Sequence, residues 1–276
     1  MSLKLMYITN DPDVAYIAQN AGVDRIFIDL EYIGKDIRQG GMDTVQSHHT
    51  LNDVKKISER IKKSEVLVRI NPIHDKTDLY GSSSEEIDEA IKNGADVLML
   101  PYFKTAAEAE EFARLVGGRC KTMLLVETPE AVSAIDEILN VDGIDEMYIG
   151  LNDLSLGYGK KFMFELLADG TVENLVNKFK KKGVSYGFGG LASLDGGLLP
   201  GRLVLKEHYH LGSSCVILSR SFCNANKVRN LDEISKIFKE GIAEIREYEE
   251  ECKNALDFEE NKKSVSSLVE GIVKNL

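Results

Sequence analysis

The chain has 276 residues, of which 43% are hydrophobic and 29% are charged, a balance typical of a globular domain with enough apolar material for a core. Its formal net charge of −11 argues against nucleic acid or an anionic membrane as the main partner, because both bind clustered Lys and Arg side chains. No apolar run approaches the roughly 20 residues that a transmembrane helix requires.

The cysteines and the first residues bear on the cellular compartment. Cys120, Cys215, Cys223 and Cys252 show no CxxC spacing, which favours reduced thiols buried as small apolar side chains. The opening segment MSLKLMYITNDPD lacks the apolar stretch and the small-residue cleavage site of a signal peptide. We therefore expect a cytoplasmic protein.

Eight short apolar runs predict strands that are covered on both faces, as in a parallel sheet, because they are nearly continuous and rich in aliphatic residues. They are residues 3–8, 25–30, 65–70, 96–101, 121–127, 146–150, 184–189 and 215–219. Between them, apolar residues recur at three- and four-residue spacing, which predicts helices. The predicted helices are residues 11–21, 51–63, 84–93, 105–116, 129–139, 171–182, 200–211 and 231–250.

Several helix ends carry recognisable signals. Ser84 and Thr128 stand where helix-capping residues are preferred. Four glycines follow predicted helix ends, where a left-handed residue is favoured: Gly22, Gly94, Gly183 and Gly212. Eight strands, each followed by a helix, predict an α/β fold of the (β/α)8 TIM barrel type over residues 1–256. An open doubly wound sheet would need a glycine-rich phosphate-binding turn after the first strand, and residues 9–12 (TNDP) do not provide one.

Two segments exceed what a barrel needs. Residues 257–276 predict an extra C-terminal helix with an apolar stripe that contains Val265, Val269 and Val273. We expect that stripe to pack on a neighbouring subunit of a homo-oligomer with closed symmetry, and packing on the chain's own barrel is the alternative. Residues 32–50 form a long polar connection, which we expect to fold over the barrel mouth as a lid.

Functional side chains of such a barrel lie at the C-terminal ends of the strands. Glu127 ends the fifth strand and Asp153 follows the sixth, so both carboxylates converge on one mouth and repel unless a cation lies between them. Oxygen ligands without His or Cys favour Mg²⁺ or Mn²⁺ over Zn²⁺. The alternative is that Glu127 caps the helix beginning at Thr128 and that Asp153 caps a turn; the spacing leaves both open.

Basic and imidazole side chains near the same mouth are further candidates. Arg69 ends the third strand, and its planar guanidinium suits a substrate carboxylate, although it could also form an ion pair with Glu31 or Glu127. Arg220 and Arg38 are weaker candidates of the same kind. His48 and His49 lie at the end of the polar loop, where a histidine is more often exposed to solvent than catalytic.

Several strings of the sequence resemble the HpcH/HpaI aldolase/citrate lyase β-subunit family, which lies within the phosphoenolpyruvate/pyruvate-domain barrels. The resemblance runs from the first strand to about Phe222, and its most specific pieces are VETPEA followed by IGLNDLS. The strings are GVDRIFIDLE, VLVRINP, IKNGADVLMLP, LLVETPEAV, GIDEMYIGLNDLSLGYG and CVILSRSF. The resemblance implies a (β/α)8 barrel, often with a C-terminal helix exchanged between subunits, Mg²⁺ or a similar cation held by Glu127 and Asp153, and a substrate-binding Arg at Arg69.

The chain departs from the family's pattern at one position. The aldolase branch has a His shortly after the acidic residue of the second strand, which acts as the general base, and this chain has Tyr32 there. The acidic residue that the citrate lyase branch often has is also absent. We therefore expect the base to come from the long loop, with His49 favoured over His48.

These observations lead to an expected function. We expect a metal-dependent (class II) aldolase or lyase that makes or breaks a carbon–carbon bond next to a 2-oxo acid, with Arg69, Asn152 and Asp153 binding the small-molecule substrate. No Lys ends a core strand, which argues against an imine-forming aldolase. One alternative is a citrate-lyase-like acyl-CoA lyase, for which the sequence shows no obvious basic cluster. Another is a catalytically silent barrel that binds metal or keto acid, which the missing His at position 32 would explain.

Overall fold

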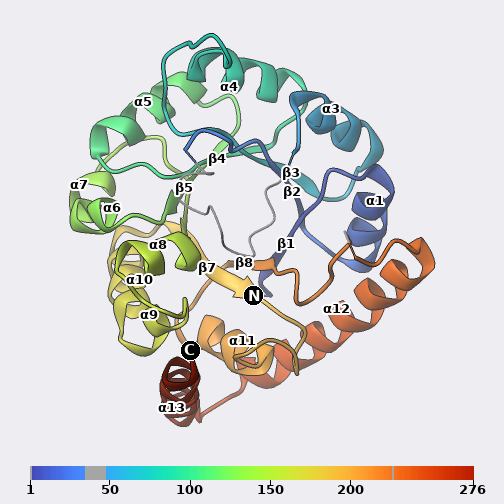
Figure 1. Ribbon diagram of the computed structural model, residues 1–276, viewed down its shortest axis with the longest axis vertical. Helices are drawn as coiled ribbons and strands as arrows, with labels where there is room; N and C mark the ends of the chain where they lie inside the picture. The colour runs from blue at the N-terminus through green and yellow to red at the C-terminus, as the bar shows by residue number, and fades with distance from the viewer. Residues whose placement is uncertain (1, 35–47, 226) are drawn as a thin grey trace.

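The computed structural model describes residues 2–34, 48–225 and 227–276, and eight parallel strands close into a barrel in the order β1 to β8 with the helices outside (Figure 1). The fold is therefore the predicted (β/α)8 barrel. Every predicted strand is present, and the bounds differ from the prediction by at most two residues at each end. The strands are β1 (Lys4–Ile8), β2 (Arg25–Asp29), β3 (Glu65–Arg69), β4 (Val97–Leu100), β5 (Lys121–Val126), β6 (Glu146–Ile149), β7 (Ser185–Leu191) and β8 (Cys215–Leu218).

The outer helices follow the predicted pattern with some differences. They are α1 (Pro12–Ala21), α3 (Leu51–Arg60), α4 (Ser83–Lys92), α5 (Ala106–Val116), α6 (Pro129–Ser133), α7 (Ile135–Ile138), α8 (Leu151–Gly157), α9 (Glu165–Ala168), α10 (Thr171–Lys182), α11 (Gly201–His210), α12 (Leu231–Lys253) and α13 (Phe258–Asn275). The single helix predicted over 129–139 is two short ones, and the sequence did not indicate α8 and α9. Thr128 caps α6 as predicted.

The start of α4 corrects one prediction. Its N-cap is Ser82 and not Ser84, because Ser82 accepts a hydrogen bond from the backbone of Glu85 while the Glu85 carboxylate accepts one from the backbone of Ser82. This reciprocal pair needs a spacing of three residues, which Ser84 does not have with either neighbouring Glu. The four glycines expected in left-handed conformation all have positive φ.

The barrel interior is filled by side chains from its own strands, and one buried ionic cluster closes its N-terminal end. Apolar residues such as Met99 and Leu125 form the inner layers. Below them Arg25, which is fully buried, donates to both carboxylate oxygens of Glu146 at 2.6 Å and to Glu65 at 2.7 Å. A buried charge requires such pairing. The open end of the barrel is therefore the C-terminal one.

The C-terminal helix α13 packs on its own chain, against α9 and α11 (Figure 1). Val265 and Val269 are buried there, and Asn261 donates to the carboxylate of Glu207 at 2.7 Å. The stripe is not covered completely, because Leu268 keeps 43% of its surface exposed. Packing of residues 257–276 on a neighbouring subunit, and the homo-oligomer that it implies, remain predictions. In the described parts of the chain, no helix combines the length and apolarity needed to cross a membrane.

His208 on α11 is a buried imidazole without polar partners among the described residues. Its ring stacks on that of Phe188 from β7, with the ring centres 3.8 Å apart. Neither ring nitrogen has a hydrogen-bond partner among the described residues, and the side chain is fully buried. Burial penalises the charged form and lowers the pKa of His208 from 6.5 to about 3.

At acid pH the buried imidazole of His208 lowers the free energy of unfolding, and replacing it is expected to remove this loss. As pH falls below 6.5 the unfolded chain binds a proton at position 208 while the folded chain does not, so the free energy of unfolding decreases until about pH 3. At about pH 5 this loss amounts to about 2 kcal/mol. Urea unfolding at about pH 7.5 and about pH 5 should show a smaller decrease for His208→Phe than for the wild type. His48→Ala, which removes an exposed imidazole, is the control, and an equal decrease in all three proteins would contradict the assignment.

Candidate active site

A cavity of about 790 Å³ opens at the C-terminal end of the barrel, and all eight strands and several of the loops that follow them contribute to its lining. The predicted site residues meet here. Those that line it are Arg69, Glu127, Asn152, Asp153, His48, His49 and Arg220. The structure therefore brings together residues that lie up to 172 positions apart in the sequence, since the first of them is His48 and the last is Arg220.

Arg69 is the centre of an ionic cluster at this mouth. Its Nε and Nη2 atoms each donate to Asp29 at 2.8 Å, and Nε lies 3.4 Å from a carboxylate oxygen of Glu31. Burial opposes the positive charge, and the carboxylates of Asp29, Glu31 and Glu127 outweigh it, so the pKa of Arg69 is well above its usual value. The predicted contact with Glu31 is present, but Asp29 is the main partner. The guanidinium also faces the cavity. This geometry is therefore compatible both with a structural ion pair at the barrel mouth and with substrate binding.

Glu127 is held from two sides. Its Oε1 accepts a hydrogen bond from the backbone N–H of Tyr102 at 3.0 Å, and Tyr102 adopts a left-handed conformation with φ of 49°, which is costly for a residue with a side chain. On the other side, a Cβ atom added at Gly150 would lie 2.8 Å from both Cβ and Oε2 of Glu127. The residue that caps the following helix is Thr128, so the capping alternative for Glu127 does not hold.

Asp153 lies in the first turn of α8, beside the exposed Asn152, and is itself buried. With Glu127 it gives the mouth two carboxylates on consecutive strand ends, both lining the cavity. In the described ranges no group of three or more His, Cys, Asp and Glu side chains is arranged to hold a metal ion. Two carboxylates suit Mg²⁺ or Mn²⁺, because such ions keep several positions for water and substrate oxygens. The residues present therefore fit the cation that the resemblance implies.

The two predicted imidazoles differ in their surroundings. His49 is buried, and its Nδ1 accepts a hydrogen bond from the backbone N–H of Asp29 at 3.0 Å. A neutral ring that accepts at Nδ1 carries its hydrogen on Nε2, so His49 presents a donor. His48 is exposed at the rim, and its ring centre lies 6.4 Å from that of Tyr32. Arg38 and most of the predicted lid fall within residues 35–47, which are outside the described residues.

Tyr32, which stands where the resemblance leads us to expect a histidine, has a supporting contact. Its hydroxyl donates to the backbone carbonyl of His49, and burial together with the charge of Asp29 raises the pKa of the phenol. Asn71 accepts hydrogen bonds from the backbone N–H groups of Tyr32 and Ile33. The bond to His49 holds Tyr32 against the residues that precede α3, and the bonds to Asn71 hold the segment after β2 against the segment after β3. A phenol with a raised pKa that already donates to a carbonyl is a poor general base.

Tyr148 is a site residue that the sequence did not single out. It lies inside the barrel on β6, lines the cavity, and donates to the carbonyls of Phe188 and Gly189 while it accepts from the backbone N–H of Ile217 at 3.0 Å. It thereby ties β6 to β7, beside the irregular register of β7 with β8. Room for its ring comes from Gly187, where an added Cβ would lie 2.7 Å from it. A tyrosine within a short buried strand was the signal that the sequence offered.

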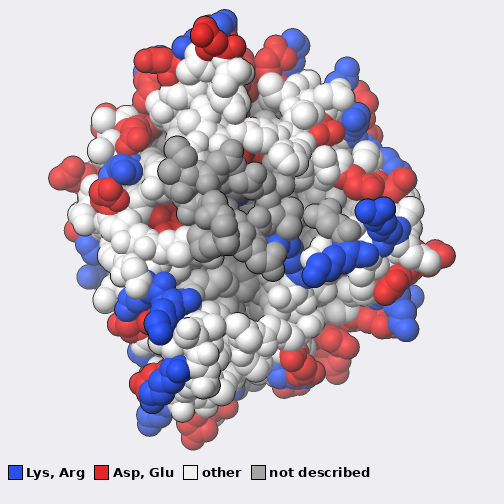
Figure 2. All heavy atoms as spheres, in the orientation of Figure 1, with Lys and Arg blue, Asp and Glu red and all other residues white. Residues whose placement is uncertain are grey.

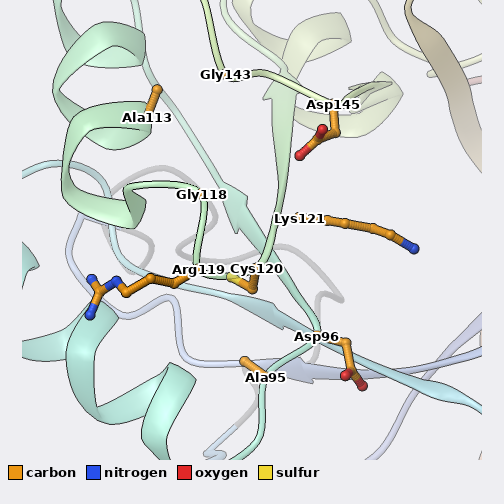
Figure 3. A pocket seen from close by; sticks show the side chains of 9 residues that line it. All are labelled: Ala95, Asp96, Ala113, Gly118, Arg119, Cys120, Lys121, Gly143 and Asp145. Atoms are coloured by element: carbon orange, nitrogen blue, oxygen red, sulfur yellow. The ribbon is translucent and has the colours of Figure 1, made fainter.

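A second hollow, of about 500 Å³, lies at the opposite end of the barrel (Figure 3). Its charged side chains already make contacts that connect neighbouring strands. Asp96 accepts a hydrogen bond from the backbone of Val66, Asp145 accepts one from the backbone of Thr122, and Lys121 forms an ion pair with Glu65. Burial raises the pKa of the Cys120 thiol there to about 11, which makes it a weak nucleophile. The hollow therefore lacks the convergent reactive groups of the C-terminal mouth.

Comparison with known proteins bears on this site. The sequence profile of the HpcH/HpaI aldolase/citrate lyase family matches residues 4–186, which carry β1 to β6, Glu127 and Asp153. The chain belongs to this family. Membership supports an aldolase or lyase activity, as do the names of relatives.

Two curated proteins that resemble the chain are hydroxypyruvate/pyruvate aldolases. The one from Roseovarius nubinhibens is 23% identical over 161 residues, which cover 54% of this chain and 62% of the relative. The one from Rhizorhabdus wittichii is 54% identical over 37 residues, which cover 13% of this chain and 15% of the relative. The part of this chain that matches thus covers less than two thirds of the length of each relative.

Solved structures agree in fold. An HpcH/HpaI aldolase from Desulfitobacterium hafniense superimposes with a TM-score of 0.64 at 18% identity and covers 85% of this chain and 93% of its own. An HpcH/HpaI aldolase/citrate lyase family protein from Burkholderia cenocepacia gives 0.61 at 16% identity, with 84% and 94% covered. The citrate synthase SbnG gives 0.61 at 15% identity, with 85% and 94% covered. At these identities the likeness supports the barrel fold.

Proposed function

We propose that this family member is a metal-dependent aldolase that forms or breaks the carbon–carbon bond next to a 2-oxo acid such as pyruvate. The observation that carries the proposal is the convergence of Glu127, Asp153 and Arg69 on one cavity at the C-terminal mouth. Two carboxylates beside a guanidinium match the needs of a small anionic substrate and a divalent cation. The hydroxypyruvate/pyruvate aldolase relatives agree with this substrate class.

The chain's own residues have distinct tasks in this proposal. Glu127 and Asp153 hold a divalent cation, which when bound supplies Lewis-acid stabilisation of the enolate. Arg69 donates to the carboxylate or the keto oxygen of the 2-oxo acid, and Asp29 fixes the plane of its guanidinium. Asn152, exposed at the start of α8, completes the binding of the 2-oxo acid.

The general base is assigned to His48 in this proposal and not to His49, which the sequence favoured. His49 Nδ1 accepts from the Asp29 backbone, so its neutral ring offers a hydrogen at Nε2 and accepts a proton there only after that bond is lost. His48 lines the cavity and has no hydrogen bond within the described residues. Its ring can therefore accept the proton of the hydroxyl that becomes the aldehyde, and His49 donates to a substrate oxygen.

Single replacements separate the two imidazoles. His48→Ala is expected to lower kcat for cleavage by about a hundredfold or more, the scale of a general acid–base group. His49→Ala is expected to lower it less and to raise KM, because it removes a donor. A normal kcat in His48→Ala with a large loss in His49→Ala would reverse the assignment.

The function itself is tested by measuring pyruvate release from a panel of 2-oxo-4-hydroxy acids, with and without Mg²⁺ or Mn²⁺. The proposal expects turnover that a chelator removes and that either cation restores. Turnover that survives complete chelation would contradict the metal-dependent assignment. An acyl-CoA lyase would cleave a thioester substrate and none of the free acids, and a silent barrel would turn over neither.

A further inference from the structure

A carboxylate of α4 reaches inward to the segment that follows β3. On the face that Figure 2 shows, most Asp and Glu side chains lie near the outer edge, over the surrounding helices. The carboxylate of Glu86 instead accepts hydrogen bonds from Asn71, from the side-chain Nδ2 at 2.9 Å and from the backbone N–H at 3.2 Å. Burial penalises the charged form and raises the pKa of Glu86, and the two bonds from Asn71 act in the opposite sense. Among the described residues, no other group donates to this carboxylate.

The contact with Glu86 fixes the direction in which the Asn71 amide points. An ionised carboxylate can only accept hydrogen bonds, so the NH2 group of Asn71 must face it. The Oδ1 atom then faces the opposite way and accepts from the backbone N–H groups of Tyr32 and Ile33 at 2.8 and 2.9 Å. Because Asn71 is buried, a reversed amide would leave these two donors facing another donor. The charge of Glu86 therefore determines how the segment after β2 is held.

That segment in turn contacts the two imidazole-bearing residues of the candidate site. The Tyr32 hydroxyl donates to the backbone carbonyl of His49. The ring of Tyr32 also lies nearly parallel to that of His48, with 23° between the planes and 6.4 Å between the ring centres. The described residues thus form a continuous line of contacts that begins at Glu86 on α4, passes through Asn71 and Tyr32, and ends at the histidines that precede α3.

We propose that Glu86 and Asn71 are positioning residues for the general base of the reaction. Glu86 orients the Asn71 amide, and this amide holds Tyr32. Tyr32 then keeps His48 and His49 at the cavity that both of them line, whereas Glu86 and Asn71 lie outside its lining. A base must stay within hydrogen-bond reach of the hydroxyl, and a displacement of about 1 Å can lower the rate by about a hundredfold. The inference rests on the proposed function, which assigns these imidazoles to proton transfer.

Moving the carboxylate from position 86 to position 71 tests the orientation of the amide. Asn71→Asp alone places two carboxylates side by side, and it should lower kcat for cleavage of a 2-oxo-4-hydroxy acid by on the order of tenfold to a hundredfold. Glu86→Gln alone replaces one of the two accepting oxygens with an NH2 group and should have a smaller effect of the same kind. The double variant Asn71→Asp/Glu86→Gln keeps the net charge, because its new amide donates to its new carboxylate, which still accepts from Tyr32 and Ile33. It should recover kcat to within about threefold of the wild type.

Two readouts separate positioning from general support of the fold. A merely structural contact would lower the free energy of unfolding and leave kcat of the folded enzyme unchanged, whereas positioning lowers kcat with little change in KM. The second readout is the NMR signal of each imidazole, which single replacements can assign because the chain has five histidines. The signals of His48 and His49 should move in Asn71→Asp and return in the double variant, while that of His210 on α11 should stay in place.

Two further comparisons connect the effect to the base. In the His48→Ala background kcat is already low, so adding Asn71→Asp should lower it little further, because both changes act on one step. Glu89→Gln is the matched control, since Glu89 lies on the same helix, is exposed and pairs with Lys92. It should keep both the wild-type kcat and the wild-type imidazole signals.

The outcomes distinguish this proposal from the function on which it rests. Wild-type kcat in Asn71→Asp, or His48 and His49 signals that do not move, would overturn the positioning role while the aldolase assignment stands. If Asn71→Asp does not fold, Glu86→Gln and Tyr32→Phe take its place, and wild-type kcat in both would have the same consequence. If the wild type cleaves no 2-oxo-4-hydroxy acid with any divalent cation, the aldolase assignment fails, and the imidazole signals alone decide whether Glu86 and Asn71 position these histidines.

Discussion

Replacing Glu127 with Gln or Asp153 with Asn is expected to abolish turnover while the barrel stays folded. Each change removes one of two negative oxygen ligands, and neutral amide oxygens bind Mg²⁺ far less well than carboxylates. Without a cation, the two carboxylates repel each other, so neither variant should lower the stability of the metal-free protein through charge. Calorimetric titration with Mn²⁺ should show at least a tenfold weaker affinity in both variants, on the scale of one lost ligand interaction.

A stability measurement provides a readout that is independent of activity. A ligand that binds only the folded state raises the melting temperature, so Mg²⁺ should raise the Tm of the wild type and not that of Glu127→Gln or Asp153→Asn. Glu130→Gln is the matched control, because Glu130 lies three residues further on, is exposed and pairs with Lys104 away from the cavity. Wild-type metal affinity in either site variant would show that the carboxylate is not a ligand.

Arg69→Lys is expected to lower kcat/KM for the 2-oxo acid by roughly a hundredfold, although the positive charge remains. An ammonium group cannot reproduce the planar fork that donates to Asp29 through Nε and Nη2 and faces the cavity at the same time. Part of the loss comes from Asp29, because this buried carboxylate would pair with an ammonium group, which is a weaker partner than the guanidinium. Steady-state kinetics with varied pyruvate concentration, together with urea unfolding, would measure both contributions.

The two contributions are separated by a second variant. Asp29→Asn leaves the Arg69 charge in place and removes only the ionic support, so it should cost stability comparable to Arg69→Lys and a smaller part of kcat/KM. If Arg69 merely supports the mouth, Arg69→Lys and Asp29→Asn would lower stability with an unchanged kcat/KM for the 2-oxo acid. That result would remove Arg69 from the substrate-binding residues.

Local regularities made the frame predictable. Strands of a closed barrel are covered on both faces, so most of their side chains are apolar. That pattern located β1 to β8 within two residues at each end. Helix ends need particular residues, which located Thr128 and Gly22. The short α8 and α9 escaped detection, because helices of four to seven residues carry too few periodic positions.

By itself the sequence determined which residues reach the mouth, since parallel strands end at the same side and the residue that follows each strand is fixed by its length. It could not determine which side chains pair there. That Arg69 binds Asp29, that Tyr102 donates to Glu127, and that His49 accepts from the Asp29 backbone depend on distances between strands. Such contacts join residues 20 to 40 positions apart, and only the closed barrel sets those distances.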